Sequence, residues 1–315
     1  MRSPAPAIGA LIVLFALASG CAALPGGERL YAERPFEPPR SYAGGVVVTE
    51  IFVPGSSALE PTLQQLAGYY PDTYMVPLAY HVHIPPPQRY YRNTRLDNRL
   101  NVLANPAGAD RARYYDVVDR TAALVDGEPV DLPAPSGEQI PQGRYNLLRD
   151  AIDREFRFIP PVTIALEVDR QSSSFTIAVE VRPLIDLAGH DLVLRVALAE
   201  RESFVPGAQA AGPPGRYDEN VHPFVVRHFL GGVDGYPIAF SDGSFRIQQH
   251  VSLDHVAHSL MNWLNEEAAR LGVTEGQQRL IDNPEMIGAG GIYVVAFVQR
   301  EQDRRILQAA VWYPE

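Results

Sequence analysis

The stretch Gly45–His83, GVVVTEIFVPGSSALEPTLQQLAGYYPDTYMVPLAYHVH, decides the fold of this chain. Its start, Val46–Val53, is rich in β-branched residues, which indicates a buried parallel strand. A helix is predicted next, because Ser57-x-x-Glu60 is a capping box and the apolar residues Leu59, Leu63, Leu66 and Tyr70 share one helical face. Tyr74–His83 is a second apolar strand. The order strand, helix, strand predicts a βαβ unit with two parallel strands.

The rest of the first half extends this unit. Three further helices are expected, at Tyr90–Ala104, Asp110–Val118 and Arg144–Phe156, the last with Leu147, Leu148, Ile152 and Phe156 on its inner side. Between them, Thr121–Val125 and Pro129–Leu132 flank Asp126-Gly127, a strong signal for a tight β-hairpin. This order of elements over residues 46–159 predicts a thioredoxin-like α/β domain.

The second half shows the alternation of apolar and polar residues that is typical of β-strands. Apolar and polar residues alternate in three segments, Thr163–Val168, Phe175–Val181 and Leu192–Leu198, which predicts an antiparallel sheet with one wet face. A helix is expected at Leu253–Leu271, and the chain closes with two strands, Ile292–Gln299 and Arg305–Trp312. We therefore expect residues 160–315 to form an antiparallel, β-sandwich-like domain with one inserted helix.

The boundary between these two domains is expected near Pro160-Pro161. Proline cannot donate a backbone hydrogen bond, and it disfavours helix in the residue before it. The helix Arg144–Phe156 should therefore end just before this point.

The N-terminus has the layout of a bacterial secretory signal sequence. Met1–Gly20 holds a basic start and a short apolar run, as in a secretory signal peptide. Ala18–Cys21 resembles a lipobox, so we expect cleavage before Cys21, a covalent lipid on its thiol and a membrane anchor. The residue after Cys21 is Ala22 and not Asp, which resembles the lipoproteins that are sent to the outer membrane. The alternative is an ordinary signal peptide with a chance cysteine. Residues 21–45 are Pro-rich and are expected to form a tether.

Composition excludes several classes of function. The formal charge is −10, which argues against nucleic-acid binding because phosphate contacts need clustered cations. The chain has no lysine, so a lysine Schiff base and a P-loop lysine are impossible. It has one cysteine, Cys21, so no disulfide can form within it.

Several segments resemble one family. Glu50 and the Tyr80-His81-Val82 strand end are similar to the first domain of the Omp-twenty-eight outer-membrane and secreted thioredoxin-like proteins, with His83 in place of an Asp. LRVALAERE, ENVHPFVVRHFLGG and IYVVAFVQREQDRRILQAAV are similar to the C-terminal β-domain of the same family. The resemblance spans nearly the whole mature chain and implies an envelope location and this fold.

The family's redox loop is missing from this chain. Where the family carries Cys-x-x-Cys, this chain has a degenerate loop, Val53, Pro54, Gly55, Ser56 and Ser57. Disulfide exchange needs a free thiolate and then a second thiol to resolve the mixed disulfide. We therefore expect the thioredoxin-like domain to be inactive in thiol redox chemistry.

Three residues are candidate ligand-binding positions: Glu50, His81 and His83. A buried acid at Glu50 would have a raised pKa and could relay protons, but without a thiol to serve it is expected to be a hydrogen-bonded structural acid that tolerates glutamine. His81 and His83 share one strand face and could bind a metal, although their spacing assigns no third ligand.

The other histidines give weaker signals. His255 and His258 are neighbours on the expected helix but complete no metal motif. His222 and His228 are expected in the core or on the surface.

Together these features predict a cell-envelope lipoprotein with a non-catalytic thioredoxin-like domain that serves as a binding or structural module. We expect a membrane contact through the lipid, a protein partner in the envelope, no nucleic acid and no cofactor. The alternative is a metal-binding protein, or a metal-dependent enzyme, that uses His81 and His83.

Overall fold

The computed structural model describes eight parts of the chain: residues 36–40, 42–53, 59–82, 103–117, 121–132, 140–204, 221–271 and 291–314. The signal peptide, Cys21, most of the tether, Pro54–Ser57, His83 and nearly all of the helix expected at Tyr90–Ala104 lie outside these residues. Within them, no helix combines the length and the apolarity that crossing a membrane requires.

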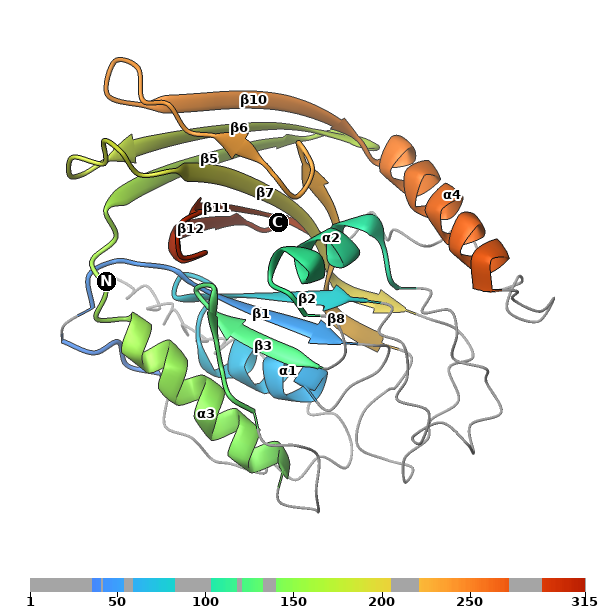
Figure 1. Ribbon diagram of the computed structural model, residues 1–315, viewed down its shortest axis with the longest axis horizontal. Helices are drawn as coiled ribbons and strands as arrows, with labels where there is room; N and C mark the ends of the chain where they lie inside the picture. The colour runs from blue at the N-terminus through green and yellow to red at the C-terminus, as the bar shows by residue number, and fades with distance from the viewer. Residues whose placement is uncertain are drawn as a thin grey trace, which may run out of the picture.

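The first half has the connectivity that the sequence predicts. Strand β1 (Val47–Val53) pairs in parallel with β2 (Met75–His81), and helix α1 (Leu59–Tyr69) connects them in sequence. Strand β3 (Ala122–Val125) pairs antiparallel with β1, and β4 (Glu128–Pro129) closes a hairpin with β3. Figure 1 shows α1 and α3 (Ile140–Glu155) on one side of these strands and α2 (Pro106–Tyr114) on the other.

The second half supplies strands to two different sheets. Strands β5 (Val162–Arg170), β6 (Ser174–Pro183) and β10 (Phe245–Ser252) form a small antiparallel sheet in the order β10-β6-β5. The other elements of this half are the strands β7 (Leu192–Phe204), β8 (Val221–Leu230), β9 (Tyr236–Pro237), β11 (Ile292–Arg300) and β12 (Ile306–Trp312), and the helix α4 (Leu253–Leu271).

One mixed sheet of nine strands runs through both halves. Its order is β12-β11-β7-β8-β2-β1-β3-β4, with β9 beside β7. The two halves meet where β8 lies parallel to β2, with Ala79 opposite Val225. The expectation of a separate sheet in each half is therefore wrong. The physical reason is that β2 would otherwise present an unpaired edge, and the apolar strand β8 covers it.

The small sheet differs from the predicted one in its third strand. Along β5 partly buried residues alternate with exposed ones, and along β6 buried residues alternate with partly buried ones, as expected for one wet face. The Leu192–Leu198 segment instead belongs to the nine-stranded sheet as part of β7, and each of its residues is buried. Helix α3 ends at Glu155 and β5 begins at Val162 in the small sheet, while the domain boundary near Pro160-Pro161 stays a prediction.

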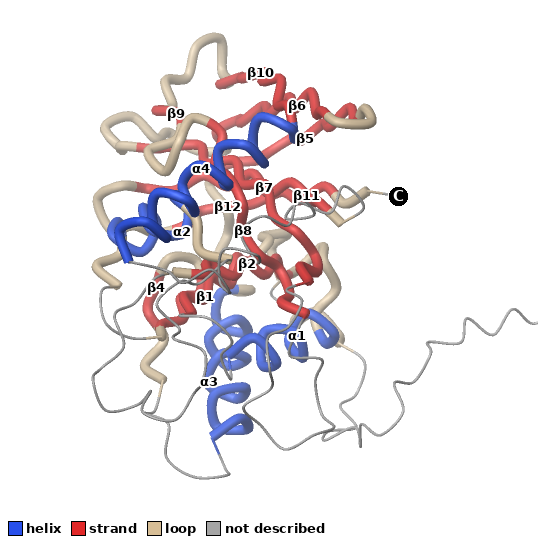
Figure 2. Tube along the Cα trace, turned by 90° about the vertical axis from the view of Figure 1, so that its right-hand side faces the viewer, coloured by secondary structure: helices blue, strands red, loops and turns tan. Residues whose placement is uncertain are grey.

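Strand β11 divides its side chains between two hydrophobic cores. Tyr293, Val295 and Phe297 pack with the residues of β1, β2, α1 and α3. The alternate residues Ile292, Val294, Ala296 and Val298 pack with β5, β6 and α4. Figure 2 shows the resulting layers, with the small sheet at one end, the nine-stranded sheet in the middle and α1 and α3 at the other end. An antiparallel strand that is covered on both faces is apolar at every position, because neither face is wet.

The helices largely confirm the predicted faces. Leu59, Leu63, Leu66 and Tyr70 are fully buried, as predicted. In α3 the expectation for Leu147 is wrong, because this side chain is 40% exposed; the buried face is formed by Tyr145, Leu148, Ala151, Ile152 and Phe156. Helix α2 begins at Pro106, earlier than expected, because Asn105 accepts a hydrogen bond from the Gly108 amide (2.9 Å) and caps the helix ahead of a proline.

The predicted hairpin turn also connects the two halves. Asp126 and Gly127 both have positive φ, +47° and +85°, as a tight hairpin turn requires. The Ile306 amide donates to the Asp126 carbonyl (2.8 Å), and the Asp126 carboxyl accepts from the Val48 amide (2.7 Å). A Cβ atom on Gly127 would lie 2.1 Å from the Arg304 carbonyl oxygen, so only glycine fits this contact.

Candidate functional site

Glu50 lies in the middle of β1, fully buried, and hydrogen-bond donors occupy both of its oxygens. Arg111 on α2 donates from Nε to Oε1 (2.9 Å) and from Nη2 to Oε2 (3.1 Å). The hydroxyls of Tyr80 and Tyr115 donate to Oε1 (2.8 Å) and Oε2 (2.9 Å). An ionised carboxylate accepts about four hydrogen bonds, so these four fill its capacity.

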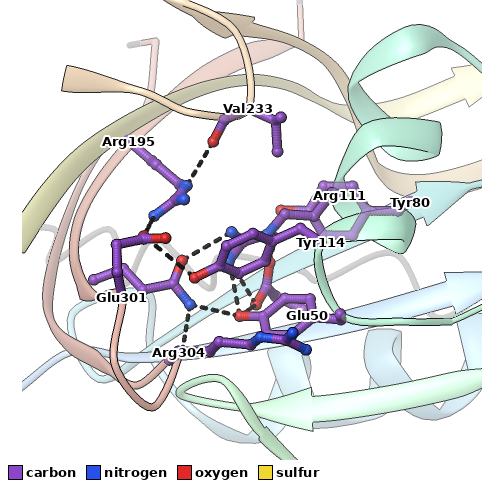
Figure 3. Close-up of polar contacts among 10 residues, drawn as sticks. Glu50, Tyr80, Arg111, Tyr114, Arg195, Val233, Glu301 and Arg304 are labelled. Carbon is purple, nitrogen blue, oxygen red and sulfur yellow. Dashed lines mark hydrogen bonds and ion pairs between the residues drawn. The ribbon is translucent and has the colours of Figure 1, made fainter. Parts of the chain in front are cut away.

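The contacts of Arg111 continue into the second half of the chain. Its Nη1 donates to Oε1 of Gln299 on β11 (2.8 Å), and Nε2 of Gln299 donates to the Tyr115 hydroxyl (2.8 Å) and to the Arg304 carbonyl. We call Glu50, Tyr80, Arg111, Tyr115 and Gln299 the Glu50–Arg111 cluster. It joins β1, β2, α2 and β11 through side chains that are all buried except that of Tyr115, which is partly buried; Figure 3 labels Glu50, Tyr80 and Arg111.

A second layer of charged groups covers this cluster. The hydroxyl of Tyr114 donates to Glu301 (3.2 Å), and Arg195 donates to Glu301 (2.8 Å) and to the Val233 carbonyl (2.7 Å). The ring of Tyr114 has the guanidinium groups of Arg111, Arg195 and Arg304 at 5.0, 4.7 and 5.4 Å from its centre. Figure 3 shows Tyr114 between Arg111 and Glu301. Cation–π contacts of this kind add attraction between the three arginines and one ring.

The pKa values of this cluster favour fixed protonation states. Burial raises the pKa of Tyr80 and of Tyr115 well above the ordinary 10, so both hydroxyls keep their protons. Burial alone would lower the pKa of Arg111, but the charge of Glu50 outweighs it and raises that pKa above its ordinary value. Arginine therefore stays charged beside Glu50, and the cluster holds no thiol.

These contacts bear on the two interpretations of Glu50. They support a hydrogen-bonded structural acid rather than a proton relay for a thiol. Because Glu50 compensates a fully buried guanidinium, this ion pair argues against the expectation that glutamine is tolerated here.

A second buried group lies beside the end of β2. Glu60 comes from the first turn of α1, His81 is the last residue of β2 and His222 lies near the start of β8. Nδ1 of His222 lies 2.9 Å from Oε1 of Glu60, and Nε2 of His81 lies 3.3 Å from the same oxygen. The two imidazole rings meet edge to face at 5.2 Å. We call these three residues the Glu60–His81–His222 cluster.

Burial and mutual contact set the charges of this cluster. Burial would raise the pKa of Glu60, but the hydrogen bond with His222 and the contacts with His81 outweigh it and lower that pKa to about 2. Burial lowers the pKa of His81, against the opposing effect of Glu60. Neither ring nitrogen of His81 makes a hydrogen bond, although Nε2 is within ion-pair distance of Glu60. The cluster thus places an ionised carboxylate beside a neutral imidazole.

The predicted site residues have different outcomes. Cys21, Pro54, Gly55, Ser56, Ser57 and His83 lie outside the described residues, so their roles stay predictions. Val53 is the buried last residue of β1. His81 lies at the predicted strand end, where its described neighbours of ligand type are Glu60 and His222.

Among the described residues, His228, His255 and His258 are not part of this cluster. His255 and His258 are exposed on α4, and Nδ1 of His258 lies 2.7 Å from the Asp254 carbonyl oxygen. His228 is partly buried, and His255 contributes to lowering its pKa after the larger effect of burial.

Sequence reasoning missed Glu60 and His222 as partners of His81. Glu60 was assigned to a capping box, and His222 to the core or the surface. A signal was present in Glu60, an acid at the start of the helix between two parallel strands. The signal for His222 required the knowledge that β8 lies beside β2.

Comparisons with known proteins bear on the fold. No family model matches this chain, and no curated protein matches it. The solved structure of HBP35 of Porphyromonas gingivalis is similar over 85% of this chain and 75% of its own, with a TM-score of 0.54 and 14% identity. A domain of the outer membrane lipoprotein Omp28 from Porphyromonas gingivalis matches 49% of this chain and 87% of its own, at 13% identity and a TM-score of 0.29. The first comparison shows a shared fold, and the second is too distant to support an argument.

Proposed function

We propose that this chain is a lipid-anchored protein of the bacterial cell envelope, in which a thioredoxin-like half serves as a binding or structural module without thiol chemistry. The location is supported by Ala18–Cys21, which resembles a lipobox at the end of an apolar signal segment. The order of β1, α1, β2, β3, β4 and α3, and the fold shared with HBP35, support the thioredoxin-like assignment.

The proposed absence of thiol chemistry rests mainly on Glu50, because hydrogen-bond donors occupy both of its carboxylate oxygens. An acid that assists a thiol needs a free oxygen or a mobile proton near it. Tyr80, Arg111 and Tyr115 together fill both oxygens of Glu50, and the guanidinium of Arg111 forms a buried ion pair with it. The acid therefore contributes to the packing of two chain halves.

The cysteine content supports the same proposal. Cys21 is the only cysteine, and it precedes β1 by a Pro-rich segment. Exchange through a mixed disulfide needs a second thiol to release the product, and a lipidated Cys21 would offer none. The alternative of metal binding or metal-dependent catalysis through His81 and His83 rests on His81 alone among the described residues.

A disulfide-exchange assay on the full chain tests this proposal. The protein, purified from membranes in detergent, is mixed with insulin and dithiothreitol, with an active thioredoxin as the positive control. We expect the rate of insulin reduction to equal that of buffer with dithiothreitol. The Cys21→Ser full chain serves as the matched sample without any sulfur nucleophile from cysteine. Reduction above the buffer rate in either sample would contradict the loss of thiol chemistry.

A further inference from the structure

Glu60, His81 and His222 have a combination of features that a structural cluster alone does not explain. Within the described ranges, they are the one group of three or more His, Cys, Asp or Glu side chains whose ligand atoms all lie within 4.8 Å of one another. All three side chains are buried, with exposures of 4%, 0% and 5%. They come from α1, β2 and β8, so the tertiary fold brings them together.

We propose that these three residues form a binding site for one divalent transition-metal ion, with Zn²⁺ as the ion that suits the ligands best. Zinc in proteins is held at about 2.0–2.1 Å by imidazole nitrogen and carboxylate oxygen, which places neighbouring tetrahedral ligands roughly 3.3–3.4 Å apart. The two distances to Oε1 of Glu60 are 3.3 Å from His81 and 2.9 Å from His222. Small side-chain shifts therefore bring the three atoms to zinc distances.

The hydrogen-bonding state of His81 favours a metal over a purely structural cluster. A hydrogen bond between His222 and Glu60 accounts for those two residues. Among the described residues, it leaves both ring nitrogens of the fully buried His81 without a hydrogen bond, although Nε2 lies 3.3 Å from Oε1 of Glu60. A buried polar atom without a partner is unfavourable, and nearly all such atoms in native proteins have one. A metal ion bound at Nε2 would supply the missing partner of His81.

The charges around the cluster suit a cation. The positive charge of Arg227 acts on His81, and Glu200 pairs with Arg227 at 2.7 Å. Arg227 also donates to Ser203 (2.5 Å). The positive charge that would oppose a metal ion is thus compensated by a carboxylate.

The donor set also indicates the kind of site. Two imidazoles and one carboxylate suit zinc and other borderline ions, whereas magnesium and calcium prefer oxygen ligands alone. Zinc sites with three protein ligands keep a position for water or a bound molecule. The site shares no residue with Cys21 or with the Glu50–Arg111 cluster, so it goes beyond the proposed function and can fail or hold independently of it.

Metal titration of the full chain tests the proposal. The protein is produced without a polyhistidine tag, solubilised in detergent and stripped with a chelator. Zn²⁺ binding is measured by calorimetry, and Co²⁺ binding by the visible absorption of a four-coordinate ion. We expect one ion per chain, and no sulfur-to-cobalt charge-transfer band. Glu60→Gln, His81→Asn and His222→Asn remove direct ligands. Each should weaken binding at least as much as the ~10–100-fold loss that is typical of changes to the groups supporting a ligand.

Matched controls separate this site from adventitious binding. The double variant His255→Asn/His258→Asn removes two exposed histidines on α4 and should keep one ion per chain with unchanged affinity. Circular dichroism checks that each variant folds. If the histidine variants do not fold, X-ray absorption of the wild-type zinc complex should still show two imidazoles and one oxygen ligand. Absence of binding to the wild type, loss in the α4 variant, or unchanged binding in the folded Glu60→Gln chain would overturn the proposal.

Discussion

Changing Arg111 to methionine tests whether the Glu50–Arg111 cluster holds the two halves of the chain together. Both side chains are fully buried, and Arg111 makes two hydrogen bonds to Glu50 and one to Gln299. Methionine keeps most of the apolar stem but removes the charge, so Glu50 is left with the hydroxyls of Tyr80 and Tyr115. Removal of one partner of a buried ion pair costs about 3–5 kcal/mol, because the other charge stays buried without compensation.

Urea unfolding followed by circular dichroism measures this cost. With an m value of about 3 kcal/mol per molar urea, a loss of that size lowers the unfolding midpoint by about 1–2 M. The matched control is Arg113→Met on the same helix. Arg113 is 77% exposed and pairs with Asp110 at 2.8 Å, so this change should cost at most about 1 kcal/mol.

A double-mutant cycle with Glu50→Gln isolates the pair itself. Each single change leaves one buried polar group without its partner, whereas the double variant Glu50→Gln/Arg111→Met removes both charges. The two losses should therefore be non-additive, with a coupling of roughly 1–3 kcal/mol. Additive losses, or a cost for Arg111→Met as small as that for Arg113→Met, would refute the role of this cluster.

Three further changes test the lipid anchor, the buried carboxyl of Asp126 and the close contact at Gly127. Cys21→Ser should release the protein from membranes or leave its precursor uncleaved, and a variant that fractionates and matures like wild type would contradict the lipid anchor. Burial raises the pKa of Asp126 well above its ordinary value of 3.8, so the folded chain keeps this proton to higher pH than the unfolded chain. The difference in unfolding free energy between wild type and Asp126→Asn should therefore fall as the pH rises from 3.8 through the pKa of Asp126 in the folded chain. Urea unfolding at several pH values measures this difference, and a rise with pH would contradict the prediction. Gly127→Ala should cost about 2 kcal/mol or more, because its Cβ would meet the Arg304 carbonyl at a positive φ. The control Gly68→Ala on α1 meets no atom within 4 Å and should stabilise the chain by about 0.5–1 kcal/mol in thermal unfolding, so equal effects would contradict the contact.

The βαβ unit could be predicted because its signals are local. The β-branched run of β1, the helical period of α1 and the Asp126-Gly127 turn each depend on residues a few positions apart. The same kind of signal located β5 and β6, whose exposed faces preserve the period of two. Leu147 shows the limit of this method, because one residue of rotation moves a side chain from the buried face to the surface.

The joining of the two halves could not be predicted from such signals. β11 is apolar at each position from Ile292 to Val298, and this run is compatible with any strand that is covered on both faces. Which core each face meets depends on the tertiary packing of the strand, which the local pattern of residues does not specify. No local pattern of residues indicates that Arg111 is the partner of Glu50, because this contact also depends on the tertiary packing. The Glu60–His81–His222 cluster likewise depends on the placement of β8 beside β2.

The intact mass of the mature protein, isolated from native membranes, tests the central claim most directly. We expect a chain that begins at Cys21, carries a diacylglycerol thioether on that sulfur and has no free thiol. This single result would support both the envelope anchor and the absence of thiol chemistry. A mature chain with a free thiol on Cys21, or one that begins at another residue, would contradict the claim.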